Sequence, residues 1–440
     1  MNFSLKIFHF YFYALVIYLF FNVFVIVQGS FLGISIFKIQ MVEGFIFLAT
    51  LYQILQLALS RNVVLVQKQV FAIQLLFLAY CVLSSLFLIR FSYQPVYIGY
   101  IIYYMLLFFA LNLSLFFIDS NSLKADIERL FKTCYQVFGY SAIVLFFLAL
   151  LQFALKSPLF ELKGEGGKEL LVKAELLGTF RPPAIFRSSY EYGILATFVL
   201  SLSLAKLLTL NKTKWDYLFF VFAFLGVLIC QTRNIYFYSL MSVFIILVIQ
   251  YYQSIHKALI KSLPFLFTII LHLLLFYLSF DAIYGDSAST GFADKSSTIV
   301  RYTYFIRLFE GYISSSHWYD YFLGWGLIQH AGDSSLISIF PDVFNDDDGT
   351  LGFDNLILSV FMYSGIIGVA LYLFLYYRIW SVIVNMLNKS KQSFILGFAG
   401  FFGAYLAAGV FNLINIGPWS VFTWFMATMV IVYGSIKNEI

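Results

Sequence analysis

The sequence contains few charged residues: Asp, Glu, Lys and Arg make up 11% of its 440 residues, whereas 62% are hydrophobic. A soluble domain of ordinary composition carries about a quarter charged residues, so this chain is too apolar for that class. The net charge of +5 is small and spread along the chain, which gives no reason to expect a nucleic-acid partner. The composition is that of an integral membrane protein.

Cysteine is also scarce. Cys81, Cys134 and Cys230 lie in or beside apolar runs. They form no metal-ligand spacing and no disulfide framework, so we expect buried, inert thiols. The first apolar run lacks a small-residue cleavage site and is too long for a signal-peptide core, so we expect it to be the first membrane span.

Long apolar runs are abundant. Each is about 17–25 residues long, the length that crosses a bilayer as a helix. Because the backbone must satisfy its own hydrogen bonds in lipid, we expect an all-α, polytopic transmembrane bundle, one integral membrane domain over residues 1–440. We expect about 12 spans, at roughly residues 7–28, 41–59, 70–89, 96–118, 133–155, 188–209, 215–230, 234–252, 259–281, 353–377, 394–411 and 418–435.

Positive charge is distributed unevenly between the connections. If the N-terminus is cytoplasmic, the short outer connections carry little besides Lys38, Arg90 and Arg233. By the positive-inside rule, both termini are therefore expected in the cytoplasm. The inner connections would carry Arg61, Lys68, Lys124, Arg129, Lys132, Lys212, Lys214, Lys257, Lys261, Lys389 and Lys391.

Two outer segments are longer than connectors need to be. Residues 156–187 contain KGEGGKE and end in GTFRPPAIFRSSYEYG, which runs into a span. Residues 282–352 are too long for a simple connector. Within them, STIVRYTYFIRLFEGYI has apolar residues at helical spacing, which predicts a short amphipathic helix on the outer membrane face.

Five arginines are expected on the outer side, where lipid surface charge does not explain them. A guanidinium group is always charged and binds phosphate through a rigid fork of donors. The set therefore indicates a phosphate-bearing substrate, although lipid headgroups or loop carboxylates are alternative partners for each member. The five are Arg181, Arg187, Arg233, Arg301 and Arg307.

Two carboxylates near span starts are candidate general bases. Glu191 is four residues after Arg187, so on a helix it either orients that arginine or accepts a proton. Asp354, followed by Asn355, opens the span after the long loop. It either satisfies free N–H groups of the helix start or acts as the base, with Asn355 as a substrate-binding candidate.

Other outer-side residues are candidates for sugar binding. Tyr190 can stack on a sugar ring, and His330 lies in the long loop without metal-ligand spacing. His317 is similar, and for both histidines sugar binding, catalysis and a structural role stay open. The run Asp346–Asp348 does not fit a calcium loop, which would need an acid at residue 344 and a glutamate at residue 355. We therefore expect no metal site.

Several of these pieces together resemble the bacterial O-antigen polymerases (Wzy-type) and the related O-antigen ligases. The pieces follow in the same order: PAIFRSSYEYG, LICQTRNIYFYSL, SSTIVRYTYF, FLGWGL and GFDNLILSVFMYSGIIGVALYLF. They cover about residues 178–375, roughly the central half of the chain. The ligases usually carry a His-Asn pair where this chain has Asp354-Asn355, which favours a polymerase.

The resemblance implies a GT-C-like fold and a glycosyltransferase that needs neither metal nor cofactor. Such an enzyme joins glycans carried on polyprenyl diphosphate at the outer face of the bacterial inner membrane, among membrane lipids and with a chain-length regulator protein as a further partner. Arg187, Arg233 and Arg301 match loop arginines that are implied to hold the diphosphate. Arg181 and Arg307 would assist them.

Three other functions stay open. A ligase would move finished glycan to a lipid acceptor. A transporter would be expected to have pseudo-symmetric halves and broken helices near the middle of the membrane, whereas this chain concentrates its polar residues outside. A metal-dependent transferase that uses polyprenyl monophosphate sugars would carry acids in the first outer loop, but that loop, GSFLGISIFK, has none.

Overall fold

The computed structural model describes most of the chain in separate ranges. These are residues 3–21, 25–31, 34–40, 50–55, 63–86, 112–119, 124–157, 180–186, 188–209, 212–252, 257–284, 317–324, 356–387, 392–409 and 418–436, together with residues 48, 58, 59 and 310. The described part is mostly helical, as expected.

The helices follow the apolar runs. Their bounds are α1 (Phe3–Phe21), α3 (Lys68–Leu86), α5 (Lys124–Leu155), α7 (Ser189–Leu207), α8 (Lys214–Ile229), α9 (Arg233–Tyr252), α10 (Lys257–Tyr284), α12 (Asp320–Leu323), α14 (Leu356–Leu387), α15 (Ser393–Ala408) and α16 (Pro418–Tyr433). Helices α7 to α10 and α14 to α16 each coincide with one expected span to within a few residues at most ends, although α14 continues to Leu387. Residues 96–111 of the expected span at 96–118 lie outside the described residues, and the end of that span is wrong, since residues 117 and 118 belong to a strand. The expected helix near residues 299–309 lies outside the described residues.

Among the described residues, five helices are long and apolar enough to cross a membrane: Lys68–Leu86, Ala125–Leu155, Arg233–Tyr251, Ala258–Leu278 and Ser364–Leu387. Two shorter apolar helices, Ser393–Ala408 and Trp419–Tyr433, accompany them. These helices support a membrane-embedded, helical protein.

Short strands also occur, which the expectation of helices alone did not include. β1 (Val25–Phe31) pairs with β2 (Ile34–Gln40), and β3 (Val63–Leu65) pairs with β4 (Phe117–Asp119), both antiparallel. The first expected span, 7–28, is therefore wrong at its end, since α1 stops at Phe21. Residues 23–27, VFVIV, are apolar enough to extend a span, but β-branched and aromatic side chains favour a strand.

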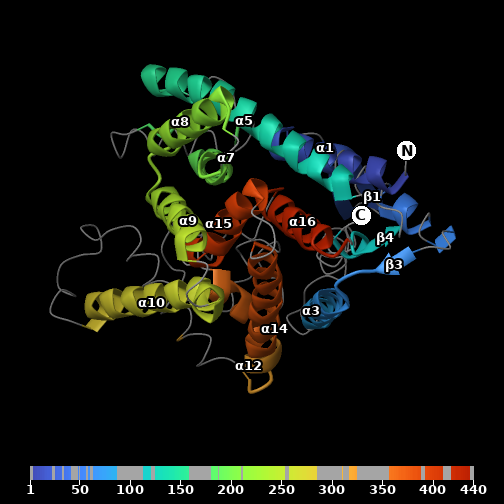
Figure 1. Cartoon of the computed structure of the whole chain (residues 1–440). Coiled ribbons are helices and arrows are strands. Elements are labelled where there is room, and N and C mark those ends of the chain that lie inside the picture. Colours follow the sequence, from blue (N-terminus) through green and yellow to red (C-terminus); the bar gives the residue numbers. More distant parts are fainter. Residues whose placement is uncertain are drawn as a thin grey trace.

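Helix α15 lies near the centre of the molecule and packs against α7, α9, α10 and α14 (Figure 1). Glycines on α15 make this packing close. A Cβ at Gly397 would lie 2.6 Å from the Leu202 Cα atom, and one at Gly400 would lie 2.8 Å from the Ser242 carbonyl oxygen. Small residues let helix backbones approach each other where lipid provides no hydrophobic drive for association. Nearly all of α15 is consequently buried.

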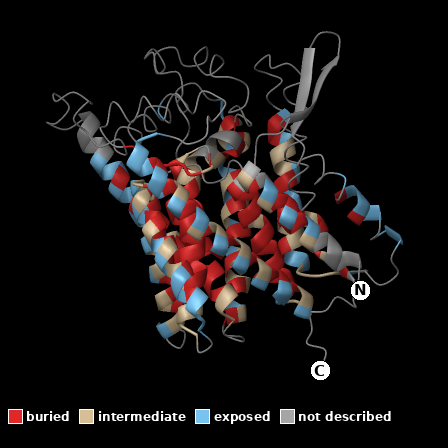
Figure 2. Ribbon diagram, turned by 90° about the horizontal axis from the view of Figure 1, so that it is seen from above, coloured by how far each residue is buried: buried red, intermediate tan, exposed pale blue. Residues whose placement is uncertain are grey.

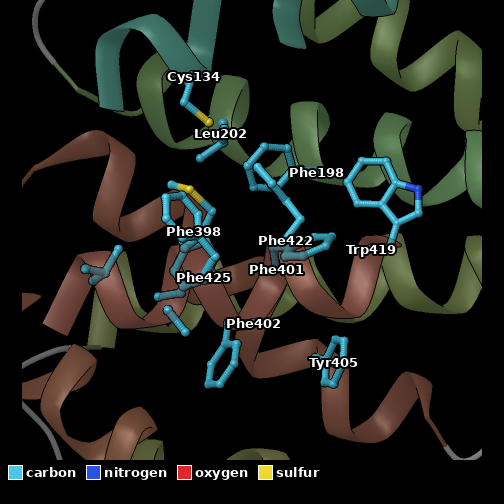
Figure 3. Close-up of a cluster of buried hydrophobic side chains, with 14 of the residues drawn as sticks. Cys134, Phe198, Leu202, Phe398, Phe401, Phe402, Tyr405, Trp419, Phe422 and Phe425 are labelled. Carbon is cyan, nitrogen blue, oxygen red and sulfur yellow. The ribbon is translucent and has the colours of Figure 1, made fainter. Parts of the chain in front are cut away.

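Aromatic side chains fill the space around α15. Buried residues line the interior of the helix bundle, while exposed ones lie mainly on its outside (Figure 2). Figure 3 shows the centre of this core, where the Phe198 ring on α7 meets Phe401 at 5.1 Å and Phe422 at 5.5 Å between centroids, both edge-to-face. This arrangement suits the aromatic quadrupole and joins α7, α15 and α16.

Helix α14 contains a break at Gly365. This residue has φ 61° and ψ −169°, a conformation that side chains disfavour. Helix α12 packs against this break. A Cβ at Gly365 would lie 2.2 Å from the Phe322 carbonyl oxygen. From α3, the Tyr80 hydroxyl donates to that same carbonyl, and the Ser84 Oγ donates to the Leu323 carbonyl at 2.6 Å. The described piece of the long loop is thus held between α3 and α14.

Candidate functional site

Four of the ten candidate site residues fall within the described part of the chain: Arg181, Tyr190, Glu191 and Arg233. They lie in the 180–186 segment and in the first turns of α7 and α9. The remaining candidates lie outside the described residues, and their roles stay predictions. These are Arg187, Arg301, Arg307, His330, Asp354 and Asn355.

The segment that carries Arg181 forms a tight turn against the bundle. The Phe186 N–H donates to the Pro183 carbonyl at 2.9 Å, and Ala184 has φ 53°. The Gln152 side chain on α5 binds Ala184 twice: its Nε2 donates to the Ala184 carbonyl at 2.8 Å, and its Oε1 accepts from the Ala184 N–H at 2.9 Å. The position of this turn relative to α5 is therefore fixed through backbone atoms.

Helix α7 begins directly after this turn. Ser188 is its N-cap, and the Ser188 Oγ accepts from the Glu191 N–H at 3.3 Å. The Ser189 Oγ lies 3.3 Å from the Thr232 Oγ1 in the connection between α8 and α9. This hydroxyl contact brings the N-terminus of α7 next to that connection.

The connection between α8 and α9 is short and well bonded. The Thr232 Oγ1 donates to the Cys230 carbonyl at 3.1 Å, and the Thr232 carbonyl accepts from the Ile235 N–H at 2.9 Å, which starts α9. Gly193 permits the close approach of α7, because a Cβ there would lie 2.5 Å from the Ile235 side chain. The N-termini of α7 and α9 therefore lie side by side.

Arg181 lies beside this pair of helix ends. The positive charge of Arg181 acts on the Cys230 thiol at the end of α8. Arg181 also interacts electrostatically with the Tyr236 side chain in the first turn of α9. The Arg181 side chain is partly buried, and its Nε atom is fully buried without a hydrogen-bond partner among the described residues.

Arg233 is the first residue of α9 and is exposed. Two helix N-termini, the partly buried Arg181 side chain and the exposed residue Arg233 therefore lie at the α8–α9 connection. Helix N-termini present N–H groups and the positive end of the helix dipole to anions. The arrangement suits an anionic ligand, and phosphate in particular matches the guanidinium fork. We call this group of features the arginine site.

No family model matches the chain, and no curated protein matches it. The chemistry of the arginine site must therefore be argued from its own residues.

Tyr190 and Glu191 follow Arg181 on the first turn of α7. Tyr190 is partly buried against the core and interacts electrostatically with Tyr238 on α9 and Tyr405 on α15. Its ring thus lies toward the bundle. Glu191 is partly buried in the first turn, where a carboxylate complements the helix dipole. Its expected pairing with Arg187 involves a residue outside the described part.

His317 belongs to the piece of the long loop held against α14. Its backbone N–H donates to the Asp320 Oδ2 at 2.9 Å, and its ring Nδ1 is 3.8 Å from the same oxygen. The ring stacks on Tyr319 with centroids 5.2 Å apart. Asp320 is buried, so this contact fixes the loop conformation. Within the described ranges, no three His, Cys, Asp or Glu side chains form a group that could hold a metal ion.

Sequence reasoning missed the residues that bring the two described arginines together. Gln152 lies within an apolar run and binds a residue 32 positions away, so no local pattern indicates its role. Thr232 precedes the first helical residue of α9, and a threonine at that position is a known helix-start signal. Ser189, by contrast, has no such signal, because its partner Thr232 is 43 positions away.

Proposed function

We propose that the chain is a polysaccharide polymerase of the outer face of the bacterial inner membrane, with both termini in the cytoplasm. Its donor is an oligosaccharide repeat carried on polyprenyl diphosphate, and its acceptor is the sugar end of another lipid-linked repeat. The proposal extends the membrane bundle to about 12 spans in a GT-C-like arrangement.

The observation that carries the proposal is the arginine site. The Arg181 Nε is buried without a hydrogen-bond partner among the described residues, and a buried polar atom without a partner is costly. The Arg181 side chain is only partly buried, so its other guanidinium nitrogens can bind an anion. The nearby ligand must be anionic, because Arg181, Arg233 and the N-termini of α7 and α9 all contribute positive charge or N–H donors. A diphosphate at the end of a lipid chain provides that charge at the membrane surface.

The reaction is a displacement at the anomeric carbon of the donor sugar. The bond between this carbon and the diphosphate oxygen breaks, and the electron pair leaves with the diphosphate. A bond forms to the acceptor hydroxyl oxygen, whose proton passes to a carboxylate, Glu191 or Asp354. Preorganised guanidinium groups stabilise the charge that builds on the departing diphosphate, which lowers the barrier.

The other loop arginines complete the same site in this proposal. Arg187 follows the turn that carries Arg181, and Arg301 and Arg307 come from the long loop. Several guanidinium groups together neutralise a diphosphate without a metal ion. Tyr190, His330 and Asn355 bind the sugars.

The test is polymerisation by the purified protein supplied only with lipid-linked repeat. We predict a ladder of products for the wild type. Arg181→Gln and Arg233→Lys should each slow ladder growth by about 10²–10³, the effect of removing one preorganised donor. Arg233→Lys keeps the charge but loses the guanidinium fork.

Arg129→Gln is the matched control. Arg129 is an exposed arginine on α5, paired with Asp126 at 3.6 Å, and it has no place in the arginine site. This variant should make a normal ladder. Wild-type rates for both Arg181→Gln and Arg233→Lys would contradict the proposal. Transfer to a lipid acceptor without any ladder would assign the chain to the ligases instead.

A further inference from the structure

Gln152 is an uncharged polar side chain buried completely within a long apolar helix, at 0% exposure. A buried amide is costly in such a setting unless both of its polar atoms are bonded. Here both are bonded, and both partners belong to one residue, Ala184. The Gln152 amide thus bonds Ala184 as a neighbouring strand would, because it accepts from the Ala184 N–H and donates to the Ala184 carbonyl.

The residue that Gln152 holds has an uncommon backbone conformation. Ala184 has φ 53°, in the left-handed region that an alanine adopts only at an energetic cost. Pro182 and Pro183 precede it, and their rings restrict the backbone further. The segment can keep this conformation only if surrounding contacts determine it, and the Gln152 amide supplies two of them.

The two hydrogen bonds from Gln152 hold the 180–186 turn, which carries Arg181. Arg181 lies three residues before Ala184, and its Nε has no hydrogen-bond partner among the described residues. The position of the Arg181 backbone, from which its side chain extends, is therefore set by the turn that Gln152 holds. Phe186 closes the other side of the turn and packs near Trp419 of α16, with ring centroids 6.4 Å apart.

We propose that Gln152 is a positioning residue of the arginine site. It holds the 180–186 turn so that Arg181 lies beside the α8–α9 connection, ready to bind one phosphate group of a polyprenyl diphosphate. This role rests on the proposed function, since it assumes that the arginine site binds a diphosphate. Gln152 itself does not contact the ligand.

The experiment measures binding of farnesyl diphosphate to the purified full chain by titration calorimetry. Gln152→Leu removes both bonds to Ala184, and Gln152→Glu keeps the acceptor but loses the donor. We expect Kd to rise about tenfold for Gln152→Leu and less for Gln152→Glu, compared with a rise of about tenfold to a hundredfold for Arg181→Gln.

Gln53→Leu is the matched control for lost stability. Gln53 is also buried and also uses both ends of its amide, bonding Ser114 at 3.1 and 3.2 Å, but it has no contact with the turn. It should lower the thermal unfolding temperature to a similar extent as Gln152→Leu and leave Kd unchanged.

The double variant Gln152→Leu/Arg181→Gln separates positioning from a general structural role. If Gln152 acts through Arg181, the double variant binds as weakly as Arg181→Gln alone. Full additivity of the two effects would overturn the positioning role, as would an unchanged Kd in both Gln152 variants. If Arg181→Gln itself binds like the wild type, the proposed phosphate site is wrong.

Discussion

At the scale of single residues, the surroundings of Arg181 distinguish it from an arginine that contacts lipid headgroups. Many arginines at a membrane surface contact lipid headgroups through exposed, mobile side chains. Arg181 differs because its Nε is buried and because its charge acts on Cys230 and Tyr236. Arg233 is exposed and carries no such signature by itself. Its position at the start of α9, beside Thr232, connects it to the same site.

At the scale of elements, the sequence predicts the helices well because apolar length alone identifies them. It fails where two signals conflict. The apolar segment VFVIV predicts the end of a span, whereas residues from Val25 onward form a strand. Gly365 lies inside an apolar run, and no change in the hydrophobic pattern indicates the break in α14. The break depends on α12, which packs there from another part of the chain.

Gly365→Ala tests how strongly α12 depends on this break. The new Cβ would meet the Phe322 carbonyl at 2.2 Å, and alanine also disfavours φ 61°. We expect a clear loss of thermal stability in detergent and release of the contacts from Tyr80 and Ser84. Gly139→Ala is the control: its Cβ would meet the Phe219 side chain at 2.5 Å rather than backbone, and Gly139 has no positive φ, so the loss should be smaller. Equal losses would contradict this account of the break.

The candidate site was partly predictable at the element scale. The sequence indicated the PPAIF turn and the QTRN connection as carriers of arginine, and both lie at the arginine site. It did not indicate how they meet, because that contact runs through Ser189, Thr232 and Gln152. These are uncharged polar side chains whose partners lie 32 or 43 positions away.

At the scale of the whole molecule, the proposal requires the arginine site to face the outside. The positive-inside pattern predicts this, and it also predicts that the opposite helix ends face the cytoplasm. Helices α7 and α9 begin side by side, so they enter the bundle from the same end.

Thiol labelling in intact cells tests this orientation. In a variant whose three native cysteines are replaced by alanine, Lys156→Cys and Lys212→Cys place exposed thiols after α5 and before α8. A membrane-impermeant maleimide should label Lys156→Cys in intact spheroplasts and Lys212→Cys only after lysis. The reverse pattern would put the arginine site in the cytoplasm.

The most direct measurement of the central claim is an experimental density map of the full chain bound to a polyprenyl diphosphate. We predict phosphate oxygens within about 3 Å of guanidinium nitrogens of both Arg181 and Arg233, beside the N-termini of α7 and α9. Diphosphate density elsewhere, with Arg181 and Arg233 turned to lipid or to carboxylates of the protein, would contradict it.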